Sequence, residues 1–71
     1  MTRRPCFYTP GHPFSFRPGE TALVVGVEMV DPNGEGDARP CFHLIWPDGA
    51  EDWSPVYDTL EMPEGRWSSK P

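Results

Sequence analysis

The 71-residue chain has room for one small domain, and eleven acidic against six basic side chains give it a net charge of −5. Ten prolines and seven glycines approach a low-complexity composition, but nine aromatic residues argue against disorder. A chain of this size buries only about 60% of its unfolded surface, which is too little for a deep catalytic cleft and its supporting residues. We therefore expect a binding module and not an enzyme.

The chain shows no sign of a membrane or export segment. Its longest uncharged apolar run, residues 21–27, is far shorter than the ~20 residues that span a bilayer. The N-terminus carries Arg3 and Arg4 but lacks the apolar run of a signal peptide, so we expect a cytoplasmic protein. Cys6 and Cys41 would pair in an oxidising compartment, or stay small buried apolar residues in a reducing one.

Charge is unevenly distributed along the chain. Residues 20–64 hold every acidic residue and a single basic one, Arg39, whereas both ends are basic. The acidic middle suits a positively charged protein or peptide as a partner. Direct nucleic-acid binding is disfavoured, because it needs a basic patch.

The first element in chain order is an extended arm over residues 1–16, where repeated proline and glycine prevent a helix. In an extended chain Phe14 and Phe16 point to the same side, so we expect them to cover one face of the domain. The sequence Arg17-Pro-Gly-Glu then predicts a turn.

Residues 21–30 predict the clearest strand, because they are rich in β-branched side chains that alternate. We expect Leu23, Val25, Val27 and Met29 to form its core face. Gly26, in the middle of the strand, indicates a bulge or a sharp bend. A polar loop over residues 31–40 follows.

A second strand is predicted over residues 41–46, and apolar side chains on both faces indicate a central position in the sheet. The sequence Pro47-Asp-Gly-Ala predicts a turn, after which residues 51–57 return antiparallel. Pro55 has no amide hydrogen, so this strand lies at an edge or breaks there. Residues 59–63 make at most one helical turn, and residues 63–71 read as a tail.

Together these segments resemble the SH3-like small barrels of the KOW and Tudor kind. The resemblance covers roughly residues 17–60 and rests on a bulged apolar strand, a charged loop, Cys41-Phe-His-Leu-Ile-Trp, an Asp-Gly hairpin and Asp52-Trp-Ser-Pro-Val-Tyr-Asp. It implies an all-β fold: a small barrel of about five short antiparallel strands over residues 17–62, with the N-terminal arm packed on it and a C-terminal tail. KOW-type modules that bind RNA are usually more basic than this chain.

Tudor-like domains often use aromatic residues near this hairpin as a cage for methylated lysine or arginine, and the matching positions are Trp46, Trp53 and Tyr57. Aromatic faces attract cations by about 0.5–2 kcal/mol, and nearby carboxylates, including Asp58, would add to the attraction. The competing interpretation is that these large rings fill the core of a small domain. The candidate partner-binding residues are Trp46, Asp48, Glu51, Asp52, Trp53 and Tyr57.

Metal binding and catalysis have little support in the sequence. Cys41 and His43 share a strand face, but with Cys6 and His12 they match no zinc-binding spacing. The serines lack a glycine-flanked nucleophile turn, and adjacent strand carboxylates point to opposite faces. We expect no metal, no cofactor and no catalytic residue.

Three functions remain as hypotheses. The first is a module that binds a cationic protein or peptide through the aromatic and acidic hairpin surface. The second is an accessory protein of a phage or mobile element, whose acidic surface imitates nucleic acid and blocks a DNA- or RNA-binding protein. The third is a self-associating structural module, in which a homodimer completes a core too small alone.

Overall fold

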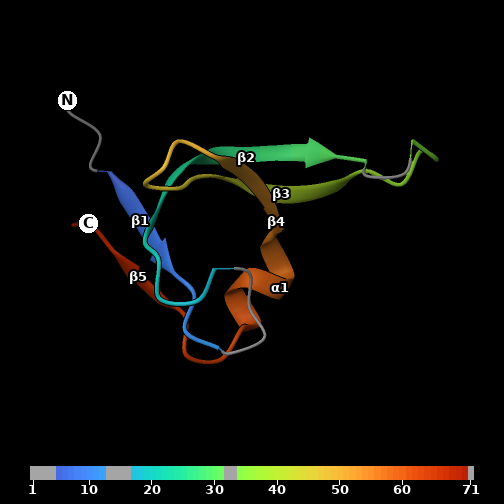
Figure 1. Ribbon diagram of the computed structural model, residues 1–71. Helices are drawn as coiled ribbons and strands as arrows, with labels where there is room; N and C mark the ends of the chain where they lie inside the picture. The colour runs from blue at the N-terminus through green and yellow to red at the C-terminus, as the bar shows by residue number, and fades with distance from the viewer. Residues whose placement is uncertain (1–4, 13–16, 32–33, 71) are drawn as a thin grey trace.

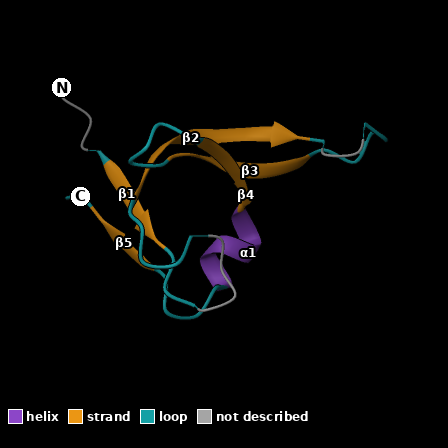
Figure 2. Cartoon of the chain, in the orientation of Figure 1, coloured by secondary structure: helices purple, strands orange, loops and turns teal. Residues whose placement is uncertain are grey.

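The chain folds into a curled antiparallel sheet with one short helix, as the computed structural model shows for residues 5–12, 17–31 and 34–70 (Figures 1 and 2). The elements in chain order are β1 (Cys6–Thr9), β2 (Ala22–Val30), β3 (Arg39–Ile45), β4 (Glu51–Pro55), α1 (Val56–Glu61) and β5 (Arg66–Ser68). The strand order is β4-β3-β2-β1-β5, so β4 and β5 are free edges and the sheet is not closed. The all-β class is thus confirmed.

Three of the five strands lie where the sequence predicted them. β3 is central, between β2 and β4, and β4 is an edge strand that ends at Pro55. The other two strands come from the segments predicted as arm and tail. Tyr8 of β1 pairs with Ala22 of β2 on one side and with Trp67 of β5 on the other, so residues 6–9 and 66–68 are both part of the sheet.

A β-bulge divides β2, as Gly26 predicted. The register with β3 shifts between Val24 and Gly26, which inserts Val25 as an extra residue. Before the bulge, Ala22 and Val24 lie on the concave face of the sheet, because Val24 pairs with the buried Leu44.

The predicted core face of β2 is therefore wrong. Leu23 pairs with Ile45 on the convex face, whereas beyond the bulge Val27 pairs with Phe42 on the concave side. The far half of the β2–β3 pair projects past the curl of the sheet (Figure 1), and Val25, Val27 and Met29 are 48%, 57% and 65% exposed. An alternating pattern holds only within an uninterrupted strand, and one inserted residue exchanges the two faces.

The core on the concave face is small. Its buried centre is Ala22, Leu44 and Trp46, against which Val24, Phe42 and Ala50 pack. Trp67 of β5 extends this core across the curl, because its ring lies 4.8 Å from that of Tyr8 and 5.1 Å from that of Phe42, between centroids.

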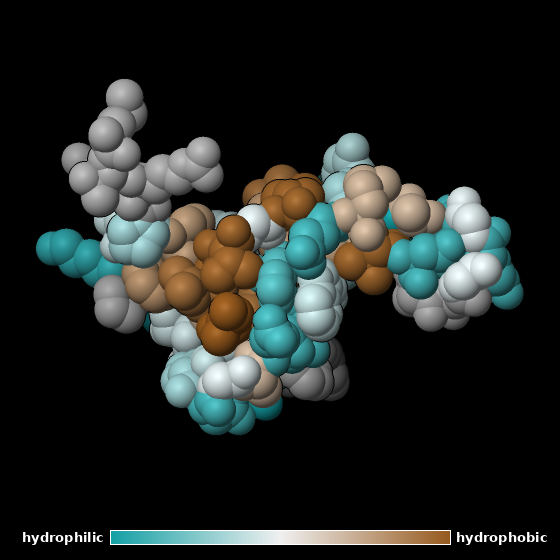
Figure 3. All heavy atoms as spheres, turned by 90° about the horizontal axis from the view of Figure 1, so that it is seen from above, coloured by the Kyte–Doolittle hydropathy of each residue, from teal (hydrophilic) through white to brown (hydrophobic). Residues whose placement is uncertain are grey.

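Further expectations concern the ends of the chain and its cysteines. Phe14 and Phe16 lie outside the described residues. Cys6 and Cys41 are both free thiols, the first exposed and the second buried. The described residues include no helix long and apolar enough to cross a membrane. Seen from above, apolar side chains gather over the top of the curled sheet, whereas the tip of the β2–β3 hairpin is hydrophilic (Figure 3).

Candidate functional site

A cavity of about 370 Å³ opens on the concave side, where the end of β3, strand β4 and helix α1 meet. Its lining combines aromatic, hydroxyl and acidic residues: Tyr8, Pro10, Leu44, Trp46, Asp52, Trp53, Ser54, Pro55, Asp58, Thr59 and Met62. The volume lies at the small end of ligand-binding pockets, and it is sufficient for one long side chain.

Trp46 is held in place by the turn that joins β3 to β4. The amide of Trp46 donates to the carbonyl of Ala50 at 2.8 Å, and the amide of Gly49 donates to the carbonyl of Trp46 at 2.9 Å. Gly49 has φ +89°, which glycine adopts at little cost. The Trp46 ring is 3% exposed, and its Nε1–H donates to Asp52 Oδ2 at 2.7 Å, so the indole is both buried and oriented.

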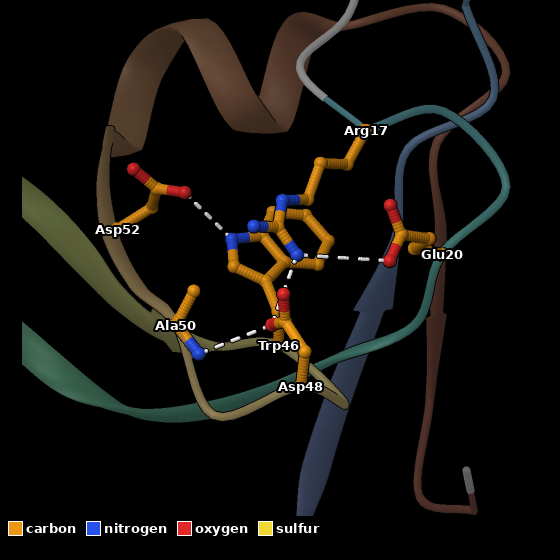
Figure 4. Close-up of polar contacts among 6 residues, drawn as sticks. All are labelled: Arg17, Glu20, Trp46, Asp48, Ala50 and Asp52. Carbon is orange, nitrogen blue, oxygen red and sulfur yellow. Dashed lines mark hydrogen bonds and ion pairs between the residues drawn. The ribbon is translucent and has the colours of Figure 1, made fainter.

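Arg17 covers the Trp46 ring from the loop that enters β2 (Figure 4). Its Cζ lies 5.3 Å from the ring centroid, within the range of a cation–π contact. The Nη1 group also donates to Asp48 Oδ1 at 3.0 Å and lies 3.7 Å from Glu20 Oε1. The protein thus places one of its own guanidinium groups over an aromatic ring, beside a carboxylate.

Ionisation in this cluster follows from these contacts. The hydrogen bond to Asp48 raises the pKa of Arg17, and the same bond lowers the pKa of Asp48, which also accepts from the Ala50 amide. Both groups are therefore charged at neutral pH. Burial raises the pKa of Tyr8 above its ordinary value, so the phenol in the cavity wall is neutral.

The two carboxylates that line the cavity, Asp52 and Asp58, have no basic partner at contact distance among the described residues. Asp52 uses Oδ2 to accept from Trp46, whereas Asp58 lies exposed at the first turn of α1. The neighbouring hydroxyls are satisfied, because Ser54 and Thr59 share a hydrogen bond and Thr59 donates to the carbonyl of Pro55. Arg17, which lies over Trp46, attracts Asp52 without forming an ion pair with it, so the cavity wall carries two carboxylates with one cation beside them.

A second polar cluster lies on the convex face. The rings of His43 and Trp53 stack with centroids 4.6 Å apart and an interplanar angle of 13°. His43 Nε2 lies 2.8 Å from Glu51 Oε1, and Nδ1 lies 3.5 Å from Glu28 Oε2. Trp53 Nε1 donates to the same carboxylate of Glu28. This cluster is complete without a ligand.

The sequence-predicted site residues are divided among several places. Trp46, Asp52 and Trp53 line the cavity, and Asp48 binds Arg17 beside it. Glu51 belongs to the convex cluster, and Tyr57 projects from α1 with 72% of its surface exposed. The rings of Trp46, Trp53 and Tyr57 therefore do not form one open cage. Trp46 is covered by Arg17 and is almost fully buried.

Sequence reasoning did not assign Tyr8 or Thr59 to the site, and it noted Asp58 only as a nearby charge. Tyr8 reaches the cavity through the pairing of β1 with β2, and Thr59 lies on the buried side of α1. Proline before a short amphipathic segment was the one available signal for α1. In the described ranges no three His, Cys, Asp or Glu side chains are arranged to hold a metal ion.

No protein-family model, curated protein or solved structure matches this chain.

Proposed function

We propose that this protein is a small non-catalytic module that binds a cationic protein or peptide, with a lysine or arginine side chain entering the cavity between β4 and α1. The main observation in support of this proposal is that two carboxylates, Asp52 and Asp58, line the cavity. Neither forms an ion pair at contact distance within the described residues. An SH3-like barrel arrangement of the strands and a cytoplasmic location belong to the same proposal.

The electrostatics of the cavity support a cation. An opposite charge brought between two carboxylates in a partly apolar recess is held more strongly than at an open surface, because less water screens it. The aromatic side chains of Tyr8 and Trp46 in the wall add apolar surface that suits the aliphatic stem of lysine or arginine, whereas the ring of Trp53 lies on the convex face against His43.

The Arg17 contact supports the same ligand chemistry. A guanidinium already lies over Trp46 and is hydrogen-bonded to Asp48, next to the cavity that Trp46 lines. The same combination of indole and carboxylate, offered by Trp46 and Asp52 on the cavity side, suits a second cation of this kind.

The test is a nuclear magnetic resonance titration of the ¹⁵N-labelled protein with the capped tripeptides Gly-Arg-Gly and Gly-Lys-Gly. The proposal expects the indole Nε1–H signal of Trp46 and the amides of residues 52–54 and 56–59 to shift in a saturable way. The citrulline tripeptide has the shape of the arginine probe without its charge, and it should leave these signals in place. No shift with either cationic tripeptide at millimolar concentration, or equal shifts with citrulline, would overturn the proposal.

A variant and a matched control locate the site. Asp58→Asn removes a charge from the cavity wall, and Glu61→Gln removes one from an exposed position on the same helix that does not line the cavity. A charge-assisted hydrogen bond contributes about 1.5–3 kcal/mol, so Asp58→Asn should raise the dissociation constant about tenfold. Glu61→Gln should change it little, and an equal effect of both would indicate general attraction to an acidic protein.

A further inference from the structure

Strand β4 is a free edge of the sheet, and its residues also border the cavity. In an antiparallel pair, successive residues turn their main-chain amide and carbonyl groups alternately towards the partner strand and away from it. The Trp46 amide donates to the Ala50 carbonyl at 2.8 Å, so this pair is bonded across the two strands. Continuing the β3–β4 register from this pair turns the main-chain groups of Asp52 and Ser54 towards β3.

The alternate residues of β4, Glu51, Trp53 and Pro55, therefore turn their main-chain groups away from the sheet. Pro55 has no amide hydrogen, and an outward position at an edge is where a strand tolerates proline. Its carbonyl accepts from the Thr59 hydroxyl, so the open part of the edge ends at Trp53. Glu51 and Trp53 are exposed, and no hydrogen bond within the described part of the chain accounts for their main-chain groups. Two amides and two carbonyls are thus open to a further strand.

The cavity lies on the concave side of this edge. Residues of β4 and α1 line it together with Tyr8 of β1, and β1 and β4 lie on opposite sides of the curl (Figure 1). Asp52 and Ser54 of β4 are among the lining residues, whereas the ring of Trp53 stacks on His43 on the convex face. Side chains of a strand alternate between the two faces, so a strand added to β4 would direct every second side chain towards the cavity.

We propose that the cationic partner binds as an extended segment that adds to the sheet antiparallel to β4, with its lysine or arginine opposite Asp52. This inference rests on the proposed function and assigns a backbone conformation and direction to its ligand. The basic side chain then points to the concave side, where Asp52 and Asp58 line the cavity. The residue before it exchanges two hydrogen bonds with Trp53, and the residue after it does the same with Glu51.

The charges of β4 favour a basic segment as the added strand. Free edges are commonly protected by lysine, by proline or by a covering segment. In β4 the proline stands at the end of the strand, and the charged residues, Glu51 and Asp52, are acidic. They repel the β4 strand of a second copy and attract a basic peptide, because opposite charges across a strand pair stabilise it and like charges destabilise it. In this mode of recognition main-chain bonds supply affinity, and alternate side chains supply specificity.

The experiment adds the capped pentapeptide Thr-Val-Arg-Val-Thr to the ¹⁵N-labelled full chain and follows hydrogen exchange of single amides. The two valines then lie opposite Trp53 and Glu51, and the arginine lies opposite Asp52. With the probe at about ten times its dissociation constant, exchange of the Glu51 and Trp53 amides should slow about tenfold, because both gain an acceptor. The amides of Asp52 and Ser54 are the internal reference: they are already bonded to β3 and should slow less.

Two methylated probes form a matched pair that needs no variant of the protein. A methyl group on the amide of the first valine removes the hydrogen that the Trp53 carbonyl would accept. The loss of one hydrogen bond should raise the dissociation constant about three- to tenfold. The same methyl group on the arginine amide, which points away from β4, should change the dissociation constant little.

Other outcomes separate this inference from the proposed function. Equal binding of the two methylated probes would overturn strand addition, and the proposed function would stand if Gly-Arg-Gly still shifts the Trp46 indole signal. A greater loss for the methylated arginine would indicate a parallel strand and overturn the antiparallel arrangement. A citrulline pentapeptide that binds as tightly as the arginine one, and still slows exchange at Trp53, would overturn the cation site but not the edge pairing.

The protein without probe supplies one more control. Slow exchange of the Glu51 and Trp53 amides that increases with protein concentration would mean that a second copy occupies the edge, which would overturn the proposal. Absence of binding by both the pentapeptide and the tripeptides would overturn this inference together with the proposed function.

Discussion

The guanidinium of Arg17 lies over the indole of Trp46, with Cζ 5.3 Å from the ring centroid. Arg17 adopts φ +51°, a backbone conformation that is unfavourable for a long side chain. The contacts of its side chain with Trp46 and Asp48 offset this strain. A loop before β2 is thereby fastened to the turn after β3, and the most buried tryptophan of the chain is covered from solvent.

Arg17→Ala should expose Trp46 and lower the stability of the protein. The expected signs are a red shift of tryptophan fluorescence and a melting temperature lower by a few degrees, because the ring loses its cover and Asp48 its partner. Arg17→Lys is the informative comparison, since an ammonium group restores charge but not the planar stack. If Arg17→Lys is destabilised as much as Arg17→Ala, the planar stack stabilises the protein and the charge does not. If neither variant is less stable than the unmodified protein, the contact makes no measurable contribution to stability.

The Arg17–Asp48 pair should make stability depend on pH in the acid range. Its hydrogen bond lowers the folded-state pKa of Asp48 below the ordinary value of 3.8, so the unfolded chain binds this proton more readily than the folded one. The contribution of Asp48 is therefore complete above pH 3.8 and is lost as the pH falls through the lowered folded-state pKa. Urea unfolding at a series of pH values should show a shallower acid-side decline in Asp48→Asn than in the unmodified protein, and parallel curves would contradict the pairing.

Asp52 should matter to stability because it accepts the indole N–H of the buried Trp46 at 2.7 Å. Asp52→Ala removes this acceptor from a donor that water reaches poorly, at a cost of about 1–3 kcal/mol. Asp52→Asn keeps a carbonyl oxygen at the same place and should recover most of that loss. Chemical denaturation measures both, and equal losses in the two variants would show that the charge of Asp52 matters and the hydrogen bond does not.

The division of the aromatic residues between the two faces depends on one turn. The sequence shows Asp48-Gly49 as a hairpin signal, but not how many residues the loop contains. The pair formed by Trp46 and Ala50 closes a three-residue loop, which sets Leu44 opposite Asp52 and His43 opposite Trp53. A two-residue loop would have shifted the register by one and placed Trp53 on the face of Trp46.

Strands with strong local patterns were predictable, and strands that depend on their partners were not. β2 and β3 have runs of β-branched and aromatic residues, and their positions follow from the sequence. β5 has only three residues, all exposed, and exists because it pairs with β1 and brings Trp67 against Tyr8. Gly26 revealed the bulge, but its effect on the two faces of β2 required the register with β3.

The contact between the two chain ends gives the last prediction, made at two glycines. A Cβ at Gly11 would collide with the carbonyl oxygen of Glu64 and lie 3.0 Å from its carbonyl carbon, and neither is a flexible side-chain atom. A Cβ at Gly26 meets nothing within 4 Å, and Gly26 does not require a positive φ. Gly11→Ala should therefore destabilise the protein by about 1–3 kcal/mol or more, as overpacking does.

Gly26→Ala is the matched control, since the same methyl group in a strand should be neutral or stabilise by up to about 1 kcal/mol. Urea unfolding followed by tryptophan fluorescence gives both values in one assay. A large loss for Gly11→Ala alone would confirm that the segment after β1 packs against the segment before β5. Comparable stability of the two variants would mean that residues 11 and 64 are not in contact. The contact beside the paired strands β1 and β5 would then be absent.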